Sequence, residues 1–128
     1  MIDRAQVEAW VAGYERAWRT PGTESLCELF AQDARYRMSP YEEPVVGLSA
    51  IARLWDAERE GPDEVFAMGS EIVAVDADTA VVRVEVAYGD PVSREYRDLW
   101  VIRFGGDGRV VAFEEWPFFP GRPYGAPG

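Results

Sequence analysis

The first twenty residues repeat apolar side chains with the spacing of an α-helix. Asp3 and Gln6 have the spacing of a capping box at the start of this segment, and Pro21 stops the pattern. The apolar positions fall on one face, formed by Val7, Trp10, Val11, Tyr14, Ala17 and Trp18. We therefore expect an amphipathic helix over residues 3–20 that packs through its aromatic face.

Shorter apolar stretches follow in the next part of the chain. Thr23 has the side chain to cap a short helix that ends near Ala31, and residues 34–38 look like a brief strand. A proline-rich loop leads into a third helix, which is closed by Gly61 and Pro62. The inward side chains of this third helix are expected to be Ile51, Leu54 and Trp55.

The second half of the chain has the pattern of strands separated by tight turns. Strands are expected at residues 64–75, 79–88, 95–104 and 109–118 because glycine, aspartate and proline gather between them. Helices followed by an antiparallel meander predict an α+β fold with the helices on one face of the sheet. The length of 128 residues suits a single domain, expected over residues 1–117, followed by an extended Pro/Gly-rich tail at residues 118–128.

Composition removes several functional classes. Acidic side chains outnumber basic ones by 23 to 13, and the net charge of −10 disfavours nucleic acid and anionic membranes as partners. The absence of histidine excludes His-based triads and most zinc sites, so we expect neither a metal nor a cofactor. Cys27 has no second cysteine to pair with, and we expect neither a signal peptide nor a membrane span. We therefore expect a cytoplasmic protein.

Several segments together resemble one protein superfamily. They are residues 14–18, 29–34, 47–55 and 104–110, with Glu115-Trp116 near the end. Their order is similar to the nuclear transport factor 2-like superfamily, and most of all to its SnoaL-like and ketosteroid isomerase-like members. The resemblance implies a cone-shaped, curved antiparallel sheet wrapped around the N-terminal helices, with a ligand cavity at the open end. It also implies a homodimer formed through the outer face of the sheet.

The ketosteroid isomerase-like resemblance gives Tyr14 the role of hydrogen-bond donor to a substrate oxyanion. The family's general base falls at Met38, and its second acid falls at Trp100. Neither an apolar methionine nor a tryptophan accepts a substrate proton. Steroid isomerisation by that mechanism is therefore not expected.

A second resemblance rests on Arg83 and Glu85, which lie two apart on one strand face and can form an ion pair. Limonene-epoxide hydrolase-like members carry such a pair, with a carboxylate on the last strand, here Glu115, and a water-holding tyrosine, here Tyr36. The resemblance implies that Glu115 activates water or removes a proton, Glu85 protonates the substrate oxygen and Arg83 orients both. Met38 stands where that family has an asparagine, which widens the expected chemistry to other small substrates.

The alternation of side chains does not determine which face of two of the strands points inward. The apolar positions 82, 84, 86 and 88 can form the core face of their strand, which would leave Arg83 and Glu85 in solvent. On the last strand, Glu115 shares a face with Phe113, whereas Glu114 lies on the other face. One of the two glutamates therefore points inward or to the cavity rim.

The other candidate ligand contacts are large apolar side chains and one acid. Asp98 alternates with Trp100 and Ile102, as a cavity acid would, although a surface charge at a strand end has the same pattern. The set expected to contact a hydrophobic ligand is Trp10, Trp18, Met38, Trp55, Met68, Asp98, Trp100 and Phe113. We expect a cofactor-independent acid–base enzyme of isomerase, cyclase, dehydratase or epoxide hydrolase type. The alternative is a non-catalytic small-molecule-binding or dimerisation module.

Overall fold

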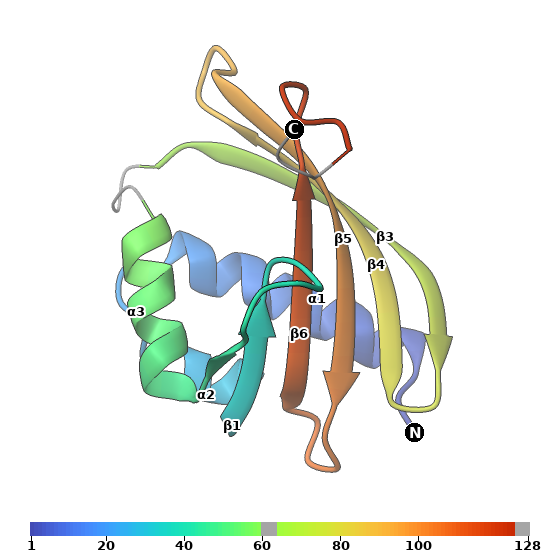
Figure 1. The fold of residues 1–128 in the computed structure, drawn as a ribbon. Coiled ribbons are helices and arrows are strands. Elements are labelled where there is room, and N and C mark those ends of the chain that lie inside the picture. The colour runs from blue at the N-terminus through green and yellow to red at the C-terminus, as the bar shows by residue number, and fades with distance from the viewer. Residues whose placement is uncertain (60–63, 125–128) are drawn as a thin grey trace.

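Residues 1–59 and 64–124, which the computed structural model describes, form three helices and six strands (Figure 1). The helices are α1 (Arg4–Arg19), α2 (Leu26–Leu29) and α3 (Leu48–Glu58). The strands are β1 (Phe30–Arg37), β2 (Val45–Val46), β3 (Phe66–Asp76), β4 (Thr79–Tyr88), β5 (Arg94–Phe104) and β6 (Val110–Phe118). The expected α+β class is confirmed, and no helix in these ranges is long and apolar enough to cross a membrane.

The strands form one curved, unclosed sheet in the order β2-β1-β6-β5-β4-β3. The expectation of a wholly antiparallel sheet is wrong at one place, because β1 and β6 run parallel. Most of the chain, including α3 and strands β3 to β5, lies between these two strands, so no tight turn forces them to be antiparallel. This parallel pair brings Tyr36 beside Phe113, two residues before Glu115.

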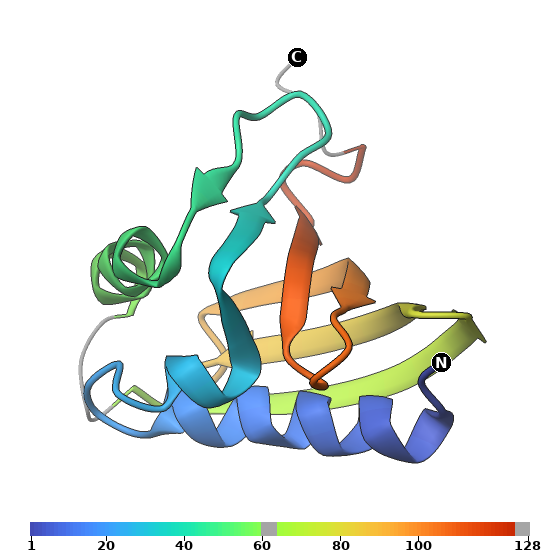
Figure 2. The same ribbon diagram turned by 90° about the horizontal axis from the view of Figure 1, so that it is seen from below.

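Helix α1 lies across the strands, and α3 stands beside β1 and β2 (Figure 2). The capping box is confirmed, since the backbone amide of Gln6 donates to Asp3 Oδ1 at 2.8 Å and that of Asp3 donates to Gln6 Oε1 at 3.0 Å. The helix ends at Arg19, and its C-cap Thr20 has extended backbone and directly precedes Pro21. Its aromatic face packs into the core, where Val7, Trp10, Val11, Tyr14 and Ala17 are buried.

Two predicted boundaries differ from the structure. The short helix α2 follows Ser25, which gives no side-chain cap, so Thr23 is not its capping residue. Strand β1 begins at Phe30, earlier than expected, because Phe30 already pairs with Val110 before the register shifts. The meander strands begin and end within two residues of their expected positions. The expected end of the third helix at Gly61-Pro62 lies outside the described residues.

Candidate functional site

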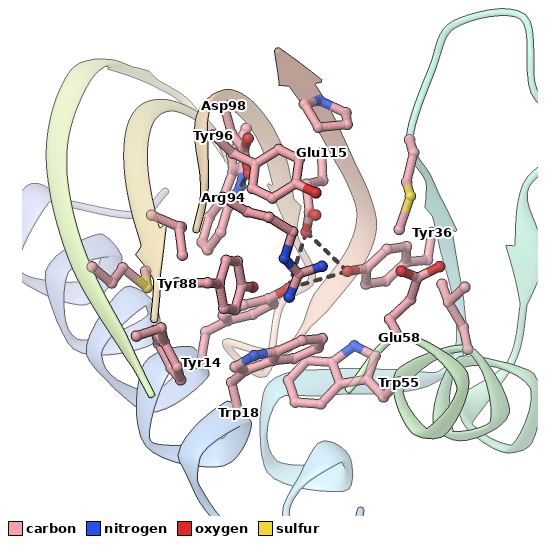
Figure 3. A pocket seen from close by; sticks show the side chains of 17 residues that line it. Tyr14, Trp18, Tyr36, Trp55, Glu58, Tyr88, Arg94, Tyr96, Asp98 and Glu115 are labelled. Carbon is pink, nitrogen blue, oxygen red and sulfur yellow. Dashed lines mark hydrogen bonds between the residues drawn. The ribbon is translucent and has the colours of Figure 1, made fainter. Parts of the chain in front are cut away.

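A cavity of about 230 Å³ lies between α1, α3 and the inner face of the sheet (Figure 3). It combines an aromatic wall with a few ionisable groups, which is the usual composition of a small-molecule site. Its charged lining residues are Glu58, Arg94, Asp98 and Glu115. Its aromatic lining residues are Tyr14, Trp18, Tyr36, Trp55, Phe66, Tyr88, Tyr96 and Trp100.

Glu115 is held by two tyrosines inside this cavity (Figure 3). Tyr14 and Tyr36 both donate through Oη to Glu115 Oε2, each at 3.0 Å, and the two phenolic oxygens lie 3.1 Å apart. Tyr14 reaches the carboxylate from the inner face of α1, and Tyr36 reaches it from the neighbouring strand β1. The arrangement engages one carboxylate oxygen twice and leaves Oε1 for another partner.

Opposing effects act on the protonation of this cluster. Burial raises the pKa of Glu115, and the charge of Glu58 adds to the increase, whereas the hydrogen bonds from the two phenols lower it. Burial and the charge of Glu115 raise the pKa values of Tyr14 and Tyr36 well above their ordinary value. Both phenols therefore stay protonated at neutral pH and keep their hydrogen bonds to Glu115.

A second carboxyl, Asp98, lies on the neighbouring strand β5 and lines the same cavity. It is only 9% exposed, and its Oδ1 has no hydrogen-bond partner among the described residues. Burial first, and then the charge of Glu115, raise its pKa to about 7, while a 3.4 Å hydrogen bond from Trp100 Nε1 opposes the increase. Asp98 is therefore a cavity acid and not a surface charge, and both of its protonation states are populated near neutral pH.

Arg83 and Glu85 lie on the opposite, outer face of the sheet. Arg83 donates to Glu71 at 3.0 Å, with both side chains about two-thirds exposed (67% and 69%). Glu85 lies 3.6 Å from Arg97, and this pair is exposed as well. The expected convergence of Arg83, Glu85 and Glu115 is therefore wrong. Val82 and Val84 take the inner face because burial of apolar side chains stabilises the fold. Burial of the Arg83 and Glu85 charges there would destabilise it.

The two glutamates of β6 are separated as the alternation requires. Glu114 lies on the outer face, where it is 3.3 Å from Arg37 Nε and accepts a hydrogen bond from Trp116 Nε1 at 3.1 Å. Glu115 points inward with Phe113. The alternative that Glu114 is the inward residue is therefore excluded.

The expected ligand-contacting residues divide into two groups. Trp10 and Phe113 do not line the cavity, because they pack in the core with ring centres 5.5 Å apart, and the Trp10 indole already donates to the Leu29 carbonyl at 2.9 Å. The structure therefore corrects the expectation for these two residues. The residues that do line the cavity are Trp18, Met38, Trp55, Met68, Asp98 and Trp100.

Several cavity residues were missed, although the sequence carried a signal for them. Arg94 and Tyr96 share the face of Asp98 by the period-two alternation of β5. Glu58 follows Trp55 and Leu54 by one helical turn on α3. Arg94 extends toward the centre of the cavity (Figure 3). Among the described residues, no group of three or more Cys, Asp or Glu side chains is arranged to hold a metal ion.

Sequence comparison gives one family. The family model described as "SnoaL-like domain" matches residues 7–113, which is most of the chain and includes every cavity residue from Tyr14 to Trp100. No curated protein shows a significant sequence match to the chain.

Solved structures with the same fold are distant in sequence. The ketosteroid isomerase-like protein from Erwinia carotovora atroseptica SCRI1043 has 22% identity and a TM-score of 0.63, over 91% of this chain and 96% of that protein. The protein RV0760c from Mycobacterium tuberculosis has 11% identity and a TM-score of 0.72, over 91% and 93% of the two chains. A computationally designed 17-OHP binder has 13% identity and a TM-score of 0.68, over 84% and 89%. At these identities the comparison concerns the fold alone.

Proposed function

The chain belongs to the SnoaL-like domain family, with the fold of the nuclear transport factor 2-like superfamily, and we propose that it is a cofactor-independent acid–base enzyme for a small apolar molecule. One observation carries the proposal. Glu115, held by two phenols, and Asp98, with an unpartnered oxygen, line the same aromatic cavity. Two carboxyl groups in different environments can divide the roles of base and acid.

In this proposal Glu115 is the general base. Its Oε1 takes a proton from the substrate, while Tyr14 and Tyr36 hold Oε2 and fix the orientation of the carboxylate. Asp98 exchanges a proton with the polar atom of the substrate, because it is present in both protonation states near neutral pH. One proton passes from substrate to Glu115 and one from Asp98 to substrate. After product release Glu115 gives its proton to solvent and Asp98 takes one from solvent, which resets the site. This scheme serves an isomerisation, cyclisation or dehydration.

The volume of the cavity limits the size of the substrate. A dry apolar cavity of roughly 150 Å³ holds one benzene ring, and sites for drug-sized ligands measure roughly 300–1,000 Å³. The present cavity, at about 230 Å³, lies between these values. We infer a substrate of one or two rings with a single polar end.

A non-catalytic ligand-binding pocket is the second candidate. It is favoured by the engagement of both phenolic protons with Glu115, which leaves neither tyrosine free to donate to a substrate oxygen without rearrangement. In this case the aromatic wall binds the ligand and the carboxyl groups only fix its orientation.

Hydrogen–deuterium exchange separates the two candidates without knowledge of the natural reaction. One- and two-ring ketones and enones are incubated in D₂O with the full chain, and NMR follows deuterium at the carbon next to the carbonyl. We expect enzyme-dependent exchange that falls at least about 100-fold in Glu115→Gln. Glu85→Gln, an exposed glutamate of the outer face, is the matched control and should keep the wild-type rate. Ligand binding without exchange would support the binding pocket instead.

Two further parts of the proposal concern assembly and location. We propose a homodimer through the outer face of the sheet, where half-buried Leu99 and Trp116 are paired across β5 and β6. The charged side chains Arg83, Glu85 and Arg97 lie beside this apolar centre. We also propose a cytoplasmic location, supported by the single cysteine.

A further inference from the structure

The cavity is acidic as well as aromatic. Among the residues that the structure describes, its lining contains three carboxylates, Glu58, Asp98 and Glu115, and one guanidinium, that of Arg94. These carboxylates come from α3, β5 and β6, so they surround the space from different sides. Glu58 is exposed, whereas Asp98 is buried and Glu115 is half-buried. Enclosing the two carboxylates together is costly unless a positive group balances them.

Several aromatic rings of the cavity wall pack edge to face against one another. Trp18 and Trp55 meet edge to face with ring centres 4.9 Å apart, and Tyr14 meets Trp55 in the same way at 5.0 Å. On the other side of the cavity, Tyr88 and Tyr96 are edge to face at 6.0 Å. Rings that line a cavity with their faces attract organic cations through their quadrupoles.

One wall of the cavity already receives a cation. The guanidinium of Arg94 lies over the ring of Tyr88, 4.8 Å from its centre. Tyr88 is therefore placed to bind a cation over its face in this cavity.

The unpartnered oxygen of Asp98 defines the missing group more closely. Oδ1 is a buried acceptor with no donor among the described residues, whereas Oδ2 accepts from Trp100 Nε1. A buried acceptor without a donor is unfavourable, so the occupant of the cavity is expected to bring an N–H or O–H to this atom.

We propose that the ligand of this cavity carries a protonated secondary or tertiary amine, whose N–H donates to Asp98 Oδ1 while its carbon substituents contact the aromatic rings. The inference rests on the proposed function and names its substrate class. In such a complex the acidic proton of the Asp98–ligand pair resides on nitrogen and not on Asp98. The carboxylate of Glu115 remains available as the base.

Binding of such a cation depends on pH in a defined direction. A positive charge beside Asp98 favours its carboxylate form, so binding below pH 7 releases a proton and affinity rises from pH 6 to pH 8. With a pKa of about 7, the ionised fraction of Asp98 rises about tenfold over this interval. The described titratable groups around the cavity are Glu58, Glu64, Arg94 and Glu115, with the phenols Tyr14, Tyr36, Tyr88 and Tyr96. Arg19 lies over the ring of Phe66, and Arg59 lies over the rings of Trp18 and Trp55, so these two guanidinium groups also face the cavity wall. The raised pKa values of Tyr14, Tyr36 and Tyr88 keep these three phenols neutral in this range.

Three matched one-ring probes test the inference with the full chain. They are N-methylbenzylamine, its neutral isostere benzyl methyl ether, and benzyltrimethylammonium, which has the charge but no N–H. Binding is measured by calorimetry and by the fluorescence of the tryptophans that line the cavity. We expect the amine to bind at least tenfold tighter than the ether at pH 8, with this ratio decreasing about tenfold at pH 6. The quaternary cation should bind at least threefold more weakly than the amine.

Two variants assign the effect to the cavity. Asp98→Asn should reduce the preference for the amine over the ether to less than threefold, with the affinity for the ether unchanged within twofold. Glu58→Gln removes one charge at the exposed end of α3 and leaves the buried core unchanged. It should lower the affinity for the amine about two- to threefold. Glu85→Gln should leave all affinities at the wild-type values.

The outcomes separate this inference from the proposed function. Equal affinity for the amine and the ether, no binding of the amine, or an unchanged preference in Asp98→Asn would overturn the amine inference. Deuterium exchange in neutral ketones would still support the enzyme in that case. Amine binding without any exchange chemistry would support the amine inference and contradict the enzyme.

Discussion

Asp98 on β5 and Glu115 on β6 face one cavity, and the negative charge of Glu115 helps to raise the pKa of Asp98. Their closeness follows from register, because Glu115 pairs with Trp100 and Asp98 lies two residues before Trp100 on the same strand face. An antiparallel pair of strands brings such diagonal neighbours within reach of each other. The carboxyl pair therefore comes from adjacent strands of the meander, and Arg83 and Glu85 have no part in it.

Asp98→Asn should make the protein more stable at high pH. The pKa of Asp98 is about 7 in the folded protein against 3.8 as its ordinary value, so the folded state holds this proton more tightly. Stability is therefore lost as pH rises from about 4 to 7, at up to roughly 1.4 kcal/mol per unit of pKa shift. We expect the free energy of unfolding of the variant to exceed that of wild type by about 2–4 kcal/mol at pH 8. Urea unfolding at pH 8 and pH 4 measures this.

The comparison at pH 4 is the control for this prediction, since Asp98 is protonated there in the folded wild type. The difference between variant and wild type should nearly vanish at that pH. A difference of the same size at both pH values would mean that ionisation of Asp98 does not affect stability.

Tyr36→Phe should shift the pH dependence of activity. The hydrogen bond from Tyr36 lowers the pKa of Glu115, so its removal raises that pKa further. Since the base must be ionised, the acidic limb of the pH–rate profile for deuterium exchange should move to higher pH. Tyr41→Phe is a suitable control, because Tyr41 is 99% exposed and should leave the profile in place. If the acidic limb of the Tyr36→Phe profile stays at the wild-type pH, the Tyr36 hydroxyl does not affect the pKa of Glu115.

Arg83→Ala should have little effect on stability or exchange. Its ion pair with Glu71 is exposed to solvent, and such pairs contribute about 0–1 kcal/mol. We expect the free energy of unfolding to fall by less than about 1 kcal/mol and the exchange rate to stay within twofold. A fall of tenfold or more in the exchange rate would contradict this prediction and show that Arg83 contributes to the reaction.

The outer face of the sheet should hold two copies of the chain together. Sedimentation equilibrium at micromolar concentration should give twice the chain mass of 14.4 kDa. Leu99→Glu places a charge beside Trp116 on the outer face of the sheet and should produce monomers with an unchanged circular dichroism spectrum. Wild-type protein that sediments as a 14.4 kDa species would contradict the homodimer.

The sequence predicts those parts of the fold that depend on local periodicity. The aromatic stripe of α1 and the capping pair Asp3 and Gln6 appear where the pattern places them, and so do the strands between the turns. The parallel pairing of β1 with β6 was not predicted, because it joins segments far apart in the chain and no local pattern encodes it. That pairing is what brings Tyr36 to Glu115.

The site was predicted in part for a related reason. Alternation along a strand identifies two faces but does not tell which is inside, so Arg83 and Glu85 were open to two interpretations. For Asp98 the same alternation also allowed two interpretations, a cavity acid or a surface charge, and it is the structure that places Asp98 in the cavity. The contribution of Arg94 and Glu58 depends on long side chains that reach the cavity from element ends, which periodicity indicates only weakly.

Titration of the Asp98 carboxyl tests the central claim most directly. The carboxyl carbon of Asp98 is followed by NMR in ¹³C-labelled wild-type protein and in Glu115→Gln. We expect a pKa of about 7 in wild type and a lower value in the variant, because the charge of Glu115 contributes to the increase. A wild-type pKa near the ordinary 3.8, or a value that does not change in Glu115→Gln, would contradict a coupled carboxyl pair in this cavity.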